Sequence, residues 1–162
     1  MHKILRVLIA DNNLEYLEQF QAYLERQQDI TVVSTVRDGH GAVKACREIM
    51  PDLAVIDLHL PVLDSVRAIK SIIAENEHIR ILGISAVAND RYALEAVKAG
   101  ALGYVKKNGP AGFGQITQAI RQLASGEVII DPNLAASILQ EFSRDYGDGF
   151  AGDQPVNLFF SK

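Results

Sequence analysis

Polar side chains that could act together on a charged oxyanion follow the apolar runs of this sequence. They come directly after four separate runs: Asp11, Asn12, Asp57, Ser85, Lys106 and Lys107. Two carboxylates, a hydroxyl and an ammonium in one pocket suit the transfer of a phosphoryl group onto a carboxylate. Mg²⁺ is a hard cation that takes oxygen ligands and lets a charged phosphoryl group approach Asp57. The hydroxyl and the ammonium then bind the other phosphoryl oxygens.

Strands and helices must alternate to bring these side chains together. The predicted strands are Ile4–Ala10, Ile30–Val36, Leu53–Ile56, Ile79–Ile84 and Gly103–Val105. The predicted helices are Leu14–Arg26, Gly41–Met50, Ser65–Glu75, Asp90–Ala99 and Phe113–Ala124. Strands that are apolar throughout are typical of a sheet covered on both faces, so we expect an α/β fold with a doubly wound, parallel five-stranded sheet. Ligands bind at the carboxyl ends of the strands in such folds.

Helix punctuation and the spacing of apolar residues agree with this pattern. The first helix is expected to bury one side, which carries Leu14, Leu17, Phe20 and Leu24. Asn89 or Asp90 is predicted to cap the fourth helix, and Gly100 follows its end. Cys46 shares a helix face with Val43 and Ile49 and is expected in the core.

The composition favours a cytoplasmic globular protein. The 162 residues are 48% hydrophobic, which suffices for one domain and a short extra segment. The net charge of -4 gives no general attraction to nucleic acid or anionic membranes. No apolar run approaches the roughly 20 residues of a membrane span, and the N-terminal residues do not form a signal peptide. A single cysteine excludes an internal disulfide and suits a reducing compartment.

The segment after Gly126 differs from the alternating part. The expected parts of the chain are a main domain, a further helix, and a linker with a tail: residues 1–128, 129–142 and 143–162. Asp131 followed by Pro132 is typical of a helix start. Glycine and aspartate dominate 143–154, as they do in linkers. The apolar end Val156–Phe160 is expected to dock on this domain, on a second copy or on a neighbouring domain.

Four motifs together resemble the receiver domain of response regulators in two-component signalling: Leu8–Asn12, Pro51–Pro61, Ile84–Ala86 and Ala99–Lys107. The resemblance covers residues 1–128 and implies a flavodoxin-like (βα)5 fold. It implies a phosphorylation-dependent switch that accepts a phosphoryl group from a histidine kinase or a phosphotransfer protein. Such a receiver is not an enzyme beyond weak autodephosphorylation, and it is expected to form a homodimer.

The resemblance also implies roles for individual residues. Asp57 is the implied phosphoacceptor, and Lys107 and Ser85 bind the phosphoryl oxygens. The implied ligands of Mg²⁺ are Asp11, Asn12, Asp57 and the backbone carbonyl of His59. Ser85 and Tyr104 are the implied switch hydroxyl and switch aromatic. On the residues alone, Ser85 is also explained as a local cap and Tyr104 as a core aromatic.

The exit from the main domain, Ala124–Pro132, resembles that of receivers in LuxR-type transcription regulators. Those proteins continue into a helix-turn-helix domain. Contact with DNA is therefore expected only through such a domain, which these residues do not encode, and no contact with membranes is expected.

Asn12 departs from the family, because most members have two adjacent acids after the first strand. The loss of one charged ligand predicts that Mg²⁺ binds weakly. The alternative function is an atypical receiver that works as a phosphorylation-independent interaction or dimerisation module. Val62 and Ser65 also replace glycines that are common in the loop after Asp57.

Two other function classes share parts of the pattern. A mononucleotide binder of similar architecture needs a cradle rich in Ser, Thr and Gly after the first strand, whereas this chain has Asn12–Glu15 beside Asp11. A haloacid-dehalogenase-type phosphatase needs a second aspartate two residues after its nucleophile, and this chain has His59 there. The sequence therefore disfavours both.

Overall fold

The computed structural model describes residues 3–87, 91–146 and 159–160. Its strands are β1 (Leu5–Ala10), β2 (Ile30–Val36), β3 (Leu53–Asp57), β4 (Arg80–Ser85), β5 (Gly103–Lys106), β6 (Ile129–Ile130) and β7 (Phe159–Phe160). Its helices are α1 (Leu14–Glu25), α2 (Gly39–Ile49), α3 (Ser65–Glu75), α4 (Arg91–Ala99), α5 (Phe113–Ala124) and α6 (Pro132–Tyr146). The predicted caps Asn89 and Asp90 lie outside the described residues.

The strands form one parallel sheet in the order β2-β1-β3-β4-β5-β6-β7. The predicted doubly wound α/β fold is confirmed, and the sheet is wider than the five strands expected. The short strands β6 and β7 extend the edge beside β5, where Ile129 pairs with Gly103 and with Phe159. Both isoleucines of β6 are buried, which explains why so short a segment joins the sheet. Of the apolar tail, residues 156–158 lie outside the described residues.

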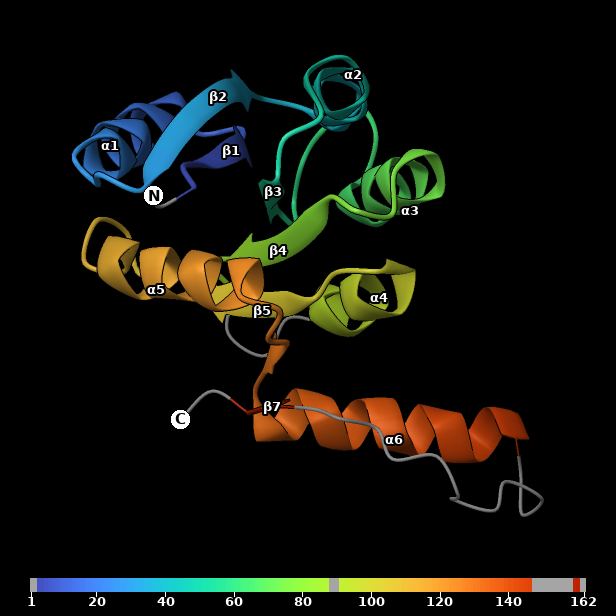
Figure 1. Ribbon diagram of the computed structural model, residues 1–162. Helices are drawn as coiled ribbons and strands as arrows, with labels where there is room; N and C mark the ends of the chain where they lie inside the picture. The colour runs from blue at the N-terminus through green and yellow to red at the C-terminus, as the bar shows by residue number, and fades with distance from the viewer. Residues whose placement is uncertain (1–2, 88–90, 147–158, 161–162) are drawn as a thin grey trace.

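Helices cover both faces of the sheet, with α1 and α5 on one side and α2, α3 and α4 on the other (Figure 1). Because successive side chains of a strand point to opposite faces, β1 serves two cores. Val7 and Ile9 pack in the cluster with α1 and α5, and Leu8 and Ala10 in the cluster with the other helices. Cys46 lies buried in this second cluster, as expected, and its burial raises the pKa of the thiol to about 12.

The buried side of α1 differs from the predicted one at its first turn. Leu14 is 49% exposed, whereas Tyr16 is only 7% exposed. The reason is the cap: the Asn13 side chain accepts a hydrogen bond from the backbone N–H of Tyr16, so the helix starts at Leu14 with that side chain directed outward. Tyr16 therefore takes the core position that the spacing assigned to Leu14.

The additional helix α6 packs along α4 (Figure 1). Leu134 and Ala135 are buried in the same cluster as Ala93 and Ala96 of α4, and Lys98 Nζ lies 2.6 Å from Glu141 Oε2. The helix continues through Tyr146, so residues 143–146, which were expected in the linker, are helical. Residues 147–158 lie outside the described part of the chain. Within the described part, no helix has the length and apolar character that crossing a bilayer requires.

Candidate functional site

Neighbouring strands end side by side at the carboxyl edge of the sheet. In the register of the sheet, Ala10 pairs with Ile56, and Asp57 pairs with Ile84. The next pair, Ser85 with Lys106, is followed by a hydrogen bond of 2.7 Å from the backbone N–H of Lys107 to the Ser85 carbonyl. The side chains that the sequence placed after separate strands therefore meet at one edge.

A buried ion-pair network forms the centre of this edge. The Nζ of Lys107 lies 2.7 Å from Asp11 Oδ2 and 2.9 Å from Asp57 Oδ2. The side chains of Lys107 and Asp57 are only 11% and 12% exposed, and that of Asp11 is 2% exposed. One ammonium therefore bridges two carboxylates that would otherwise repel each other at short range.

Backbone groups orient the two carboxylates. The N–H of Asn13 donates to Asp11 Oδ1 at 2.9 Å, and the N–H of His59 donates to Asp57 Oδ1 at 2.7 Å. In each case the donor lies two residues after the aspartate, which is the geometry of an Asx turn. Each carboxylate therefore has one oxygen held by the backbone and the other held by Lys107.

Burial and charge act in opposite directions on the network. Burial raises the pKa of the Asp11 carboxyl, and the hydrogen bond from Lys107 offsets only part of that rise. Burial by itself lowers the pKa of the Lys107 ammonium, but the hydrogen bond to Asp11 and the charge of Asp57 outweigh it, so its pKa lies above the ordinary value. Lys107 is therefore fully charged at neutral pH.

The loop after Asp57 is fixed by Ser65, one of the residues that replace a family glycine. The Ser65 hydroxyl donates to the Asp57 carbonyl at 2.6 Å and accepts from the N–H of Leu60 at 3.1 Å. Val62, the other replacement, has a φ of 72°, in the left-handed region that a β-branched residue rarely adopts. Its side chain is exposed, so the strain of this turn is local.

Ser85 and Tyr104 meet at one residue of the loop after β4. The Ser85 hydroxyl, which is fully buried, accepts from the N–H of Val87 at 3.1 Å. The Tyr104 hydroxyl donates to the carbonyl of Val87 at 3.2 Å. The local cap that the sequence offered for Ser85 is thus present in this conformation. Val87 is therefore bonded to both side chains, through its N–H to Ser85 and through its carbonyl to Tyr104.

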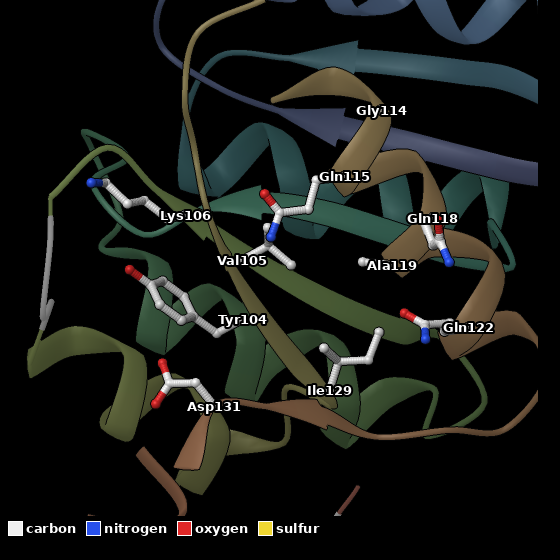
Figure 2. A pocket seen from close by; sticks show the side chains of 10 residues that line it. All are labelled: Tyr104, Val105, Lys106, Gly114, Gln115, Gln118, Ala119, Gln122, Ile129 and Asp131. Carbon is white, nitrogen blue, oxygen red and sulfur yellow. The ribbon is translucent and has the colours of Figure 1, made fainter. Parts of the chain in front are cut away.

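The two adjacent lysines after Val105 lie in different surroundings, because neighbouring side chains of a strand alternate in direction. Lys107 reaches the carboxylates, whereas Lys106 is exposed. Lys106 lies with Tyr104, Asp131 and residues of α5 around a separate hollow of about 750 Å³ (Figure 2). Lys106 is therefore a surface residue apart from the acidic site.

Two of the predicted metal-site residues lie at the rim rather than in the network. Asn12 is exposed, and its backbone carbonyl accepts a hydrogen bond of 3.4 Å from Arg37. His59 is also exposed, and its ring packs edge-on against Tyr92 of α4 at a centroid distance of 5.3 Å. The described residues include no cluster of three or more His, Cys, Asp or Glu side chains suited to a metal ion.

This donor set fits Mg²⁺ in kind but supplies little charge. The available oxygens belong to two carboxylates, an amide and a backbone carbonyl: Asp11, Asp57, Asn12 and His59. Mg²⁺ prefers oxygen ligands and retains several waters, so it does not need a full set from the protein. Hydrogen bonds from the backbone and from Lys107 already engage both carboxylates, so an ion has to share them.

Two residues that the sequence did not assign to the site contact it: Tyr16 contacts Lys107, and Ser65 contacts Asp57. The Tyr16 ring lies over the Lys107 ammonium, with 4.0 Å between Nζ and the ring centroid. In the sequence, the only indication of this contact was that Tyr16 is an aromatic residue beside the predicted apolar side of the first helix. Ser65 was noted only as a replacement for a glycine in the loop. Its hydrogen bond to the Asp57 carbonyl cannot be predicted without the path of that loop.

Comparison with protein families gives one match that covers most of the chain. The model described as the response regulator receiver domain matches residues 7–121. Among curated proteins, the chain is 32% identical over 139 residues to the oxygen regulatory protein NreC of Staphylococcus epidermidis. That alignment covers 85% of this chain and 63% of the relative, so the chain spans just under two thirds of the regulator.

Solved structures show the same architecture. A LuxR-family two-component response regulator from Aurantimonas superposes with a TM-score of 0.74 at 30% identity, over 86% of this chain and 99% of that one. The receiver domain of the putative response regulator NarL from Mycobacterium tuberculosis gives a TM-score of 0.70 at 25% identity, over 77% of this chain and 99% of that one.

Proposed function

The chain belongs to the family of response regulator receiver domains, and on that premise we propose that Asp57 is the residue that accepts a phosphoryl group. The observation that carries the proposal is the Lys107 ammonium, which lies 2.9 Å from Asp57 Oδ2 and 2.7 Å from Asp11 Oδ2 at the carboxyl edge of the sheet. A buried, oriented carboxylate beside a fixed cation is the arrangement that phosphoryl transfer onto an aspartate needs.

The transfer follows from this geometry. A carboxylate oxygen of Asp57 forms the new P–O bond while the bond from phosphorus to the donor nitrogen of a phosphohistidine, or to the oxygen of an acyl phosphate, breaks. The Lys107 ammonium donates to a phosphoryl oxygen and balances part of the added charge. Asp11, Asp57, Asn12 and the His59 carbonyl would hold Mg²⁺, which would supply further charge neutralisation. The backbone N–H of His59 keeps the acceptor carboxylate oriented.

We expect the phosphoryl group to act on the loop after β4. It adds close to two negative charges beside Ser85. The Ser85 hydroxyl then turns to donate to a phosphoryl oxygen and gives up the hydrogen bond that it accepts from the Val87 N–H. The Val87 carbonyl, to which Tyr104 donates, moves with the same residue. Tyr104 packs in the cluster that holds α4 and α6 together. We therefore expect phosphorylation to change how α6 packs on α4. That change in turn would alter how a second copy or an output domain attaches.

The similar proteins indicate which partners to expect for this chain. The family implies a histidine kinase or phosphotransfer protein as donor and an output domain as the receiver of the signal, and the alignment covers 63% of NreC. We propose that DNA is reached only through such a domain and that the phosphorylated form is a homodimer. The alternative, a phosphorylation-independent interaction module, is favoured by one observation: among the described residues the acidic site holds only two carboxylates, and the Asn12 side chain is exposed.

Phosphorylation of Asp57 is tested by intact-mass measurement. With Mg²⁺ and a small acyl phosphate or a histidine kinase, the wild-type chain is expected to gain one acid-labile phosphoryl group. Asp57→Asn is expected to gain none, because the amide cannot form the acyl phosphate. Equal incorporation in both proteins would exclude Asp57. No incorporation in the wild type would favour the interaction module.

Restoring the missing acid tests the metal site. Asn12→Asp is expected to strengthen Mg²⁺ binding about tenfold, because ligand charge tunes the affinity of a hard-cation site. Titration of Mg²⁺ into both proteins at one pH and salt concentration measures the change. The same substitution at the neighbouring Asn13, a helix cap, is the matched control and is expected to leave Mg²⁺ affinity nearly unchanged. If Asn12→Asp binds no better than the wild type, residue 12 does not contact the metal.

A further inference from the structure

The proposed chemistry does not use the aromatic ring that lies against its lysine. Lys107 Nζ is 4.0 Å from the centroid of Tyr16, a residue of α1 that is 7% exposed. An ammonium has three N–H donors, and the carboxylates of Asp11 and Asp57 take two of them. The face of an aromatic ring attracts the remaining positive charge, and the attraction is strongest where water is excluded.

The ring is itself held in place from two directions. On its core side it packs against Phe113 and Phe20, at centroid distances of 5.3 and 5.9 Å. On its backbone side, the N–H of Tyr16 donates to Asn13 Oδ1 at 3.0 Å, and the N–H of Asn13 donates to Asp11 Oδ1. The contacts form a closed path from Asp11 through α1 to the ring and back through Lys107.

The ring rather than the hydroxyl carries this contact. Among the described residues, the Tyr16 hydroxyl is a buried polar atom without a hydrogen-bond partner. Burial, and to a smaller extent the charges of Asp11 and Asp57, raise the pKa of this phenol, so it remains neutral. A neutral, unpaired hydroxyl brings no charge to the site, and phenylalanine would present the same π face.

We propose that the Tyr16 ring is a positioning group for phosphoryl transfer, which fixes the Lys107 ammonium between Asp11 and Asp57 before the phosphoryl group arrives. The proposal rests on the proposed function of Asp57. A lysine side chain has four rotatable carbon bonds, and the two carboxylates alone restrain its tip from one side. The ring restrains it from the other side, so the donor is already aimed when the new P–O bond forms.

The test compares three substitutions in the full chain. Tyr16→Leu removes the ring and is expected to slow phosphorylation by a small acyl phosphate about threefold to thirtyfold at saturating phosphodonor and Mg²⁺. Tyr16→Phe keeps the ring and is expected to restore the rate to within about twofold of the wild type. Leu24→Ala is the matched control, since it removes a fully buried side chain of the same cluster at the other end of α1. It is expected to lower stability while leaving the rate of the folded protein unchanged.

A second readout does not depend on phosphorylation. The ε-methylene protons of Lys107 should show an upfield ring-current shift by NMR in the wild type and in Tyr16→Phe. The shift should be lost in Tyr16→Leu and kept in Leu24→Ala. If the wild type takes up no phosphoryl group, the proposed function fails, and the NMR comparison alone decides whether the ring holds the ammonium.

Three results would overturn the proposal. Tyr16→Leu could phosphorylate at the wild-type rate, its Lys107 shift could match that of the wild type, or Leu24→Ala could slow phosphorylation as much as Tyr16→Leu does. The last result would assign the effect to the packing of α1 on the sheet rather than to the contact with Lys107.

Discussion

Replacing Lys107 with methionine is expected to remove most of the phosphorylation of Asp57 and to lower the free energy of unfolding by about 3 kcal/mol. Methionine keeps much of the length of the side chain but leaves Asp11 and Asp57 as two buried carboxylates without a cation. Removing one partner of a buried ion pair is strongly destabilising for that reason. The lost donor to the phosphoryl oxygens is expected to slow transfer about a hundredfold. Chemical denaturation and phosphoryl incorporation from an acyl phosphate measure the two effects.

The neighbouring lysine offers a matched control. Lys106→Met makes the same chemical change at an exposed side chain beside the hollow in Figure 2. It is expected to change stability by less than about 0.5 kcal/mol and to leave phosphorylation unchanged. Equal effects of the two substitutions would mean that Lys107 acts only through the net charge of the protein, and the bridging role assigned to it would be wrong.

Replacing Ser85 with alanine is expected to leave Asp57 able to accept a phosphoryl group while removing most of the structural response. The hydroxyl bonds Val87 in this conformation and is proposed to bind the phosphoryl group in the other, so alanine removes the contact that distinguishes the two states. A hydrogen bond to a charged group contributes about 1.5–3 kcal/mol, which is enough to shift a two-state equilibrium roughly tenfold or more.

The response has two readouts, because α6 covers part of the face that phosphorylation is expected to change. Sedimentation with a stable phosphoryl mimic reports association of two copies. Hydrogen exchange of α4 and α6 reports whether α6 loosens, with the Lys98–Glu141 ion pair as the local contact. The wild type is expected to respond in at least one of them, and Ser85→Ala in neither. Ser143→Ala, at an exposed position of α6, is the control and should respond like the wild type. A full response by Ser85→Ala would return Ser85 to the role of a local cap.

The sequence by itself determined the first five strands, the helices that alternate with them and the acidic residues at the strand ends. Asp11 and Asp57 each follow a continuous apolar run, and a run of that kind is a local signal of a buried parallel strand. Once the strands are parallel neighbours, their ends must share an edge, so the meeting of the two aspartates with Lys107 followed without any knowledge of distances. The order and spacing of the motifs carried the family resemblance in the same way.

Only the tertiary structure decided which side chains surround that centre. Lys107 and Tyr16 are neighbours because β5 ends and α1 begins at the same carboxyl edge of the sheet. Helical periodicity does not predict which residue a buried ring contacts. The helix starts at Leu14, as predicted, but its first turn places Tyr16 rather than Leu14 in the core, which apolar spacing does not resolve.

Tertiary packing also decided the contacts of Ser65 and of α6. Ser65 reaches back to Asp57 only along the path of the loop, and α6 could have packed on any apolar face within reach. The packing of α6 on α4 depends on the small residues Ala93 and Ala96, which leave room for Leu134. It depends also on the ion pair between Lys98 and Glu141, which are far apart in the chain. Local sequence sets which face of an element is apolar, whereas the partner of that face is set by the free energy of the whole packed chain.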